Sequence, residues 1–294
     1  MLEWDLTVKN FVVDILGEDT FHLALPPFIK AMGFAEHYGD EQEIEEWILN
    51  SIKMFYEQGR FHCVGVRESQ GGKSANYVGF SSLIPVETTG WIPYVGVDPN
   101  FQGRGLGRKL MLKVLEIARE IQLETIELCS SQAGIPFYQS IDFKANYPIC
   151  GYDIAETRKN SKQDLQIDTT IPDWILKMDR EVTGIDRQKL FPIHRYDKVP
   201  IINDPGHGYG FLYKTRIGPI IADSLRLAQE ILLKAIELGA TSLILVEDTP
   251  LKKQLTEVAT LKPQPLLDNL KMTFGTPLQQ DLSRLYGFRS VAYG

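Results

Sequence analysis

The stretch Val97-Asp98-Pro99-Asn100-Phe101-Gln102-Gly103-Arg104-Gly105-Leu106-Gly107 decides how this 294-residue chain is interpreted. An apolar, strand-like run precedes it, and an amphipathic, helix-like run follows it. Three alternating glycines leave no side chain between backbone N–H groups and a ligand. The first turn of a helix offers unpaired N–H donors and a partial positive charge. The stretch therefore predicts a loop-to-helix cradle for a phosphate-bearing ligand.

Other glycine motifs fit this stretch less well. A Walker A loop needs Lys and then Ser or Thr after its last glycine, whereas Arg108 and Lys109 follow Gly107. The dinucleotide fingerprint G-x-G-x-x-G fails because no glycine stands at position 108. A purely structural left-handed turn would need neither three glycines nor the flanking charge of Arg104 and Arg108. The pattern favours a pyrophosphate site.

The segments on either side support this interpretation. The run 91–97 reads as a strand, but Pro93 and Gly96 lie inside it and indicate a bulge or a splayed strand that a ligand approaches closely. Asp98-Pro99-Asn100 ends that strand. A helix is then predicted from an apolar stripe at helical spacing, which consists of Leu106, Leu110, Val114, Ile117 and Ile121.

The remaining elements of the first half are assigned from periodicity and turn residues. They are a helix near 40–52, strands at 61–66, 77–84, 125–129 and 143–154, and a short helix at 134–140. An almost wholly polar run, 155–165, is predicted to be a linker.

The second half repeats the order strand, turn, amphipathic helix and buried strand. The two copies are 95–129 and 217–246. The second copy lacks a Gly-x-Gly run and instead carries Asp223 just before its helix. An acid at that place caps a helix but repels phosphate. We therefore expect one such phosphate-binding site per chain, in the first half.

Gln102, Gly105 and Gly107 fit the pattern Gln/Arg-x-x-Gly-x-Gly/Ala. This segment resembles the acetyl-CoA signature of the GNAT N-acetyltransferase superfamily, and the second half resembles the degenerate partner domain of tandem-GNAT proteins. The resemblance implies an α+β fold with a mixed, mainly antiparallel sheet flanked by helices. It implies two GNAT-like domains in tandem: residues 1–156 as the acyl-CoA-binding catalytic domain, and residues 157–294 as a second domain without the coenzyme motif.

The same resemblance implies roles for residues around the cradle. Backbone groups of Val95 and Val97 would pair with the pantetheine arm as if it were an added strand. One of their N–H groups would polarise the thioester carbonyl. The residues that would surround the pyrophosphate are Gln102, Gly103, Arg104, Gly105, Leu106, Gly107 and Arg108.

A second family feature is a tyrosine in the pattern Tyr-x-x-x-Gly-Phe. Tyr138 and Phe143 fit it, except that Asp142 replaces the glycine. Aspartate tolerates the left-handed conformation better than most residues, so the turn can persist. The resemblance implies that Tyr138 protonates the departing thiolate as general acid. The structural alternative is a packing aromatic residue with a solvated hydroxyl.

The predicted reaction moves an acetyl group from acetyl-CoA, or another acyl group from its acyl-CoA, to an amine by direct attack. The general base stays open among four residues: Glu36, His37, Glu87 and Glu127. One alternative is a non-catalytic acyl-CoA-binding regulatory or sensor protein. Another is a structural adaptor whose cradle binds nothing.

Composition restricts the partners. A net charge of −7 and a pI of about 5.4 argue against broad nucleic-acid binding. The chain has no long apolar run and no signal-peptide pattern at its start, so we expect no membrane contact. The expected acceptor is a small-molecule or peptide amine. The second domain would shape the acceptor pocket or an oligomer contact, which leaves a homodimer open.

The three cysteines, Cys63, Cys129 and Cys150, show no CxxC spacing. This argues against a disulfide framework or structural zinc and favours the reducing cytoplasm. Cys129 reads as a small buried hydrophobe. His207 has no partner at metal-ligand spacing, so we expect no metal. Asp186-Arg187 reads as a structural ion pair rather than a substrate wall.

Overall fold

The computed structural model describes residues 10–33, 41–57, 59, 61–70, 76–157, 160–191, 199–247 and 250–290. The chain divides into two compact units, Met1–Ile126 and Glu127–Gly294. Both combine a mainly antiparallel sheet with helices, as the sequence predicts for an α+β protein. The predicted boundary between the tandem domains, after residue 156, stays a prediction.

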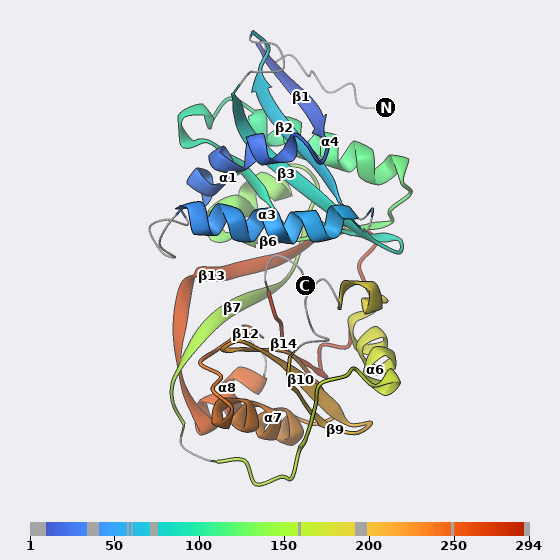
Figure 1. The fold of residues 1–294 in the computed structure, drawn as a ribbon, viewed down its shortest axis with the longest axis vertical. Coiled ribbons are helices and arrows are strands. Elements are labelled where there is room, and N and C mark those ends of the chain that lie inside the picture. Colours follow the sequence, from blue (N-terminus) through green and yellow to red (C-terminus); the bar gives the residue numbers. More distant parts are fainter. Residues whose placement is uncertain are drawn as a thin grey trace. The chain divides into compact units, whose positions relative to one another are not determined.

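The first unit contains a strand meander (Figure 1). Its strands are β1 Phe11–Leu16, β2 His62–Glu68, β3 Tyr77–Val86, β4 Thr89–Trp91 and β5 Val95–Val97. β1, β2 and β3 pair antiparallel in sequence, and both β4 and β5 pair with β3. The strand predicted at 91–97 is thus interrupted at 92–94, around Pro93, because proline cannot donate to a strand ladder.

Helices cover both faces of this sheet. They are the 3-10 helix η1 Phe21–Ala24, α1 Leu25–Met32, α3 Glu41–Glu57, the 3-10 helix η3 Pro99–Phe101 and α4 Leu106–Glu120. A Cβ placed on Gly96 would meet Phe28 of α1, whereas a Cβ placed on Gly79 would meet Leu110 of α4. The predicted apolar stripe of α4 is buried from Leu106 to Ile117, which confirms the direction of its core face.

The second unit is built on a larger sheet. Its order is β6-β13-β7-β12-β11-β10-β9-β8, and β14 pairs with β11. The bounds are β6 Thr125–Ser131, β7 Lys144–Thr157, β8 Gln166–Asp168, β9 Ile201–Asp204, β10 Gly208–Tyr213, β11 Arg216–Ala222, β12 Ser242–Val246, β13 Ala259–Gly275 and β14 Leu285–Gly287. Only the part of β6 from Glu127 onward belongs to this unit.

β7 and β13 form a long antiparallel ribbon (Figure 1). Thr157 pairs with Ala259 and Glu156 with Thr260, so the start of the predicted linker 155–165 is strand. The polar composition of this run predicted a linker. The backbone is a strand because it pairs with a distant partner strand, which local sequence does not show.

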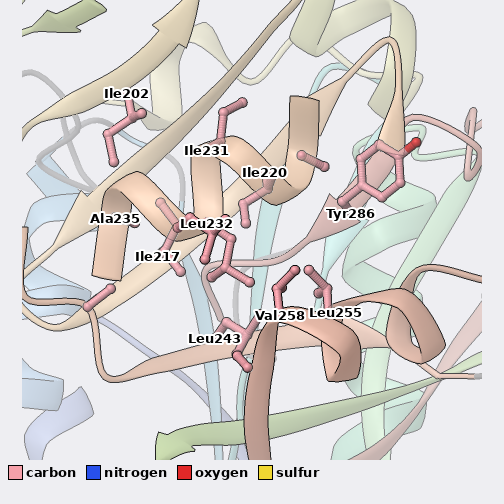
Figure 2. Close-up of a cluster of buried hydrophobic side chains, with 14 of the residues drawn as sticks. Ile202, Ile217, Ile220, Ile231, Leu232, Ala235, Leu243, Leu255, Val258 and Tyr286 are labelled. Carbon is pink, nitrogen blue, oxygen red and sulfur yellow. The ribbon is translucent and has the colours of Figure 1, made fainter. Parts of the chain in front are cut away.

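The helices of the second unit leave two apolar cores, one on each face of the sheet. The helices of this unit are the 3-10 helix η4 Gln132–Gly134, α5 Ile135–Gln139, α6 Asp173–Thr183, the 3-10 helix η5 Gln188–Leu190, α7 Leu225–Glu237 and α8 Pro250–Val258. Ile231 and Leu232 of α7 meet Leu255 of α8 and Leu243 of β12 in one core (Figure 2). Among the described helices, none combines the length and apolar character needed to span a bilayer.

Candidate functional site

The strand β5 presents one edge to β3 and turns the other away from it. Gly96 lies opposite Phe80, and hydrogen bonds continue the ladder on both sides, from Ser82 N to Tyr94 O and from Asp98 N to Val78 O. Alternate residues of an antiparallel strand bond to one neighbour. The backbone groups of Val95 and Val97 therefore point away from β3, which is the orientation that the predicted pairing with a pantetheine arm requires.

The loop 98–105 is fixed by its own polar side chains. Asp98 Oδ1 accepts a hydrogen bond of 2.9 Å from Asn100 N, and its other carboxylate oxygen lies 2.9 Å from Lys30 Nζ. Gln102 Nε2 donates to Val97 O at 2.9 Å. The signature glutamine thus ties the loop back to β5 and occupies the Val97 carbonyl, a role that sequence reasoning did not assign to it.

The glycines give the loop its exposed, left-handed backbone. Gly103 has φ +74° and Gly105 has φ +76°, a region that side chains enter only with strain. A Cβ on Gly103 would meet nothing within 4 Å, so this side of the loop is open. Leu106 is buried and anchors the helix directly behind it.

The first turn of α4 is suited to an anion. Gly105 is its N-cap, so no side chain caps the helix, and the first turn contains no acid. The first helical hydrogen bond runs from Lys109 N to Gly105 O, so the helical ladder of α4 starts at Gly105. Arg108 and Lys109 add positive charge in this turn.

Two cationic side chains near the cradle, those of Arg104 and Lys109, hydrogen-bond to backbone carbonyls. Arg104 donates to Asn100 O at 3.1 Å, and its guanidinium lies 5.1 Å from the centre of the Phe101 ring. Lys109 Nζ donates to Phe11 O at 3.3 Å. These contacts hold Arg104 against the loop and connect α4 to β1.

The corresponding turn of the second unit is built differently. Only residues 223–224 separate β11 from α7, whereas 98–105 separate β5 from α4. Ser224 caps α7 by accepting a hydrogen bond from Leu227 N at 3.3 Å. Asp223 lies 2.6 Å from Arg284 Nη2 and 3.2 Å from His207 Nδ1. The expectation of a single coenzyme site per chain stays a prediction.

Tyr138 lies on α5, in the second unit. Its ring packs against Phe137 and Phe143, with centroid distances of 5.0 and 5.8 Å. Burial raises the pKa of the Tyr138 phenol, so the hydroxyl stays protonated around neutral pH. Asp142, at the glycine position of the pattern, has φ +70°, as expected for a residue that keeps the left-handed turn.

Glu127, one of the candidate bases, is held in a buried ion pair. Its carboxylate lies 2.9 Å from Lys271 Nζ, and both side chains are only 2% exposed. Thr273 Oγ1 donates to Glu127 at 3.4 Å. Burial lowers the pKa of Lys271, but the negative charge of Glu127, together with Tyr147, Cys129 and the hydrogen bond to Glu127, raises it overall. A carboxylate committed to such a pair is poorly placed to accept a proton from a substrate.

Sequence reasoning missed Lys271, because its partner is 144 positions earlier in the chain and no local pattern marks it. The other candidate bases remain open. Glu87 lies exposed in the turn between β3 and β4 with φ +52°. Glu36 and His37 lie outside the described residues.

Cys129 and Arg187, which were candidates for other functions, have structural roles. Burial raises the pKa of Cys129 to about 12, which disfavours a nucleophilic thiolate. Arg187 lies buried beside Asp179, with an Nη2–Oδ2 distance of 2.6 Å, and Tyr209 Oη donates to the same carboxylate oxygen. The ion pair thus joins Arg187 to Asp179 of α6. Among the described residues, no group of three or more His, Cys, Asp and Glu side chains could hold a metal ion.

Comparison with known proteins assigns both halves of the chain. Residues 18–143 match the acetyltransferase (GNAT) family model, and residues 175–287 match an acetyltransferase (GNAT) domain model. The first match continues past Ile126, so α5 and most of β6 belong to the first domain by sequence and to the second unit by packing.

Individual relatives agree with these family matches. The N-alpha-acetyltransferase RimI of Mycobacterium tuberculosis is 32% identical over 109 residues, which are 34% of this chain and 66% of that protein. A glucosamine 6-phosphate N-acetyltransferase of Trypanosoma brucei brucei is 39% identical over 57 residues, or 19% of this chain and 39% of that protein. The chain thus covers less than two thirds of the length of these curated relatives.

Solved structures extend the likeness over the whole chain at the level of fold. A candidate acetyltransferase from Pyrococcus horikoshii covers 100% of this chain and 99% of its own, with a TM-score of 0.82 and 23% identity. A GCN5-related N-acetyltransferase from Sphaerobacter thermophilus covers 92% and 98%, with a TM-score of 0.58 and 14% identity. The glycine cradle and the two family matches together show that the chain belongs to the GNAT acetyltransferase family and carries two GNAT domains in tandem.

Proposed function

We propose that this protein is an acetyl-CoA-dependent N-acyltransferase whose coenzyme site lies at the start of α4. The observation that carries the proposal is the exposed left-handed loop at Gly103 and Gly105, followed by a helix without a side-chain cap or an acid in its first turn. Backbone N–H groups in that arrangement bind phosphate oxygens. The acidic chain concentrates Arg104, Arg108 and Lys109 there, which supplies the positive charge a pyrophosphate needs.

The thioester arm would lie along the free edge of β5. The N–H and C=O of Val95 and the N–H of Val97 point away from β3 and are available to an added strand-like ligand. The Val97 carbonyl already accepts from Gln102, so it is not needed for the arm. A Val95 or Val97 N–H would polarise the acyl carbonyl and stabilise the oxyanion that forms on attack.

The proposed reaction is a direct transfer. The neutral amine nitrogen attacks the thioester carbon, a C–N bond forms, and the C–S bond breaks with its electron pair left on sulfur. Tyr138 gives its hydroxyl proton to that sulfur, and the nitrogen loses one proton to solvent or to a base that stays unassigned. The phenolate left on Tyr138 then takes a proton from solvent. The raised pKa keeps Tyr138 in the protonated form that this role requires.

The proposed acceptor is a small-molecule or peptide amine. The relatives named above are an N-alpha-acetyltransferase and an amino-sugar phosphate N-acetyltransferase, so their names span both kinds of amine. A test panel should therefore hold peptides with a free α-amine beside amino sugars. Free-thiol release from acetyl-CoA reports transfer to any member of the panel.

Matched glycine variants test the cradle. Gly103 and Gly206 both have positive φ, +74° and +82°, and a Cβ placed on either would meet nothing within 4 Å. Gly103→Glu places bulk and negative charge in the proposed pyrophosphate site, whereas Gly206→Glu makes the same change in the turn before β10. We expect acetyl-CoA to raise the melting temperature of the wild type and of Gly206→Glu, and to have little effect on Gly103→Glu.

The outcomes separate the alternatives. A stabilisation equivalent to about 2.7 kcal/mol is expected at a ligand concentration 100 times Kd. The absence of any shift in the wild type at millimolar acetyl-CoA would refute coenzyme binding. A shift without thiol release for any amine would instead favour a non-catalytic acyl-CoA sensor. Equal shifts in both glutamate variants would place the coenzyme elsewhere.

A further inference from the structure

The two domains differ at the outer edge of the strand that leads to the cradle or to its counterpart. β5 pairs with β3, and no second strand pairs with β5 among the described residues. β11 pairs with β10 on one side and with the C-terminal strand β14 on the other. The edge that the first domain keeps for a ligand is therefore covered by protein in the second.

β14 lies in a split between two parallel strands. β11 and β12 pair only at Arg216↔Ser242 and Ile217↔Leu243, after which the pairing stops. Beyond that point β14 bonds to both strands. Ala222 N donates to Arg284 O at 3.1 Å, and Phe288 N donates to Ile244 O at 2.9 Å.

The fit of β14 in this split is close. A Cβ on Gly218 would lie 2.2 Å from Phe288 O, so only glycine allows the approach. Leu285 and Phe288 are buried in the core on one face of the sheet, and Tyr286 is buried in the core on the other. The ion pair of Arg284 with Asp223 fastens the beginning of the segment beside the start of α7.

We propose that residues 284–288 occupy the edge of β11 that corresponds to the free edge of β5, and that they substitute there for an acyl-pantetheine arm. The inference rests on the proposed function, because the equivalence takes the free edge of β5 as the thioester slot. It predicts that the slot between β11 and β12 takes no acyl-CoA while β14 is in place.

Hydrogen exchange of the full chain, combined with equilibrium dialysis of acetyl-CoA, tests the proposal. We expect one bound acetyl-CoA per chain. We also expect the ligand to slow exchange in 95–108 and to leave 216–222 and 284–288 unchanged and slow. Two bound equivalents, or faster exchange of 284–288 together with slower exchange of 216–222 on adding acetyl-CoA, would overturn the proposal. Absence of binding or of protection at 95–108 would instead count against the proposed function.

A pair of glycine variants tests the occupancy of the slot. Gly218→Ala should push the Phe288 carbonyl away and speed exchange of 284–288 by at least about tenfold. Gly239→Ala is the control, because Gly239 also has positive φ but has open space around it. If Gly218→Ala unfolds the whole chain, Arg284→Ala takes its place, since it breaks only the link to Asp223. Rapid exchange of 284–288 in the wild type, or no change in both loosening variants, would refute β14 as a bound occupant.

Discussion

The first turns of α4 and α7 show how two copies of one architecture come to differ at the start of a helix. α4 begins after a long exposed loop with left-handed glycines, and its N-cap has no side chain. α7 begins directly after β11, and Ser224 caps it. Helix N-terminal N–H groups need partners. The second domain supplies a partner from the side chain of its N-cap residue, whereas no side chain caps the helix in the first.

Charge at the two turns follows the same division. Arg108 and Lys109 lie in the first turn of α4, whereas Asp223 precedes α7 and holds Arg284 and His207. A phosphate would be attracted to the first turn and repelled from the second. The contrast teaches that one architecture can start its helix either with a side-chain cap and an acid or with neither.

The largest expected effect concerns catalysis. Tyr138→Phe should lower the rate of thiol release about 100- to 10,000-fold, because a positioned general acid contributes that much. Acetyl-CoA affinity should stay unchanged. Tyr213→Phe, on β10 of the second domain, is the matched control and should keep the wild-type rate. Equal rates for both variants would remove Tyr138 from the mechanism.

Two ion pairs differ in burial, because the carboxylate of one is buried and the carboxylate of the other is partly exposed. Lys271→Met leaves the carboxylate of Glu127 buried and unpaired, which should lower the free energy of unfolding by about 3–5 kcal/mol. Arg284→Met breaks the pair with Asp223, whose side chain is 41% exposed, and should cost under about 1 kcal/mol. Urea unfolding measures both. Similar losses for the two variants would contradict the burial argument.

The helix starts themselves give smaller effects. Ser224→Ala removes the cap of α7 and should cost about 1 kcal/mol of stability without changing acetyl-CoA affinity. Gly105→Ala forces a side chain into the left-handed region and should cost about 1–2 kcal/mol, with weaker acetyl-CoA binding as well. Thermal unfolding with and without acetyl-CoA separates the two effects. A loss of affinity in Ser224→Ala would place a coenzyme at α7.

The smallest expected effect is an absence of pH dependence. A phenol ionises as pH rises through its pKa, and burial raises that of Tyr138 above the ordinary value of about 10. The general acid is therefore intact at all lower pH values. The pH profile of thiol release at saturating substrates should show no decline between about pH 8 and 10. A decline in that interval, absent in Tyr138→Phe, would show that the phenol ionises earlier.

Much of the first domain could be predicted from local sequence. The glycine spacing located the loop, and the apolar stripe located α4 and its buried face. Pro93 indicated an irregularity in the strand predicted at 91–97, and the structure divides that strand there into β4 and β5. Asp142 is a residue type that tolerates the left-handed conformation, and it adopts that conformation in the structure. Each of these features depends on residues close together in the chain, where steric rules and helical or strand periodicity apply directly.

The strands β13 and β14 could not be predicted in this way. β13 contains Pro263, Pro265 and several polar residues, and it pairs with β7 through irregular registers more than a hundred positions away. β14 is three residues long and is held between β11 and a single bridge to β12. Their hydrogen-bond partners come from distant segments, so the local pattern carries little of the signal.

The sequence by itself determined where a glycine-rich turn could form and which half of the chain lacks the alternating glycines, because glycine conformation and local charge are set by the residues present. Tertiary structure alone decided what Gln102, Glu127 and β14 do. Gln102 bonds to the Val97 carbonyl, Glu127 is paired with a buried lysine from β13, and β14 covers the edge of β11. Polar groups must find partners when they are buried, and folding chooses those partners from the whole chain.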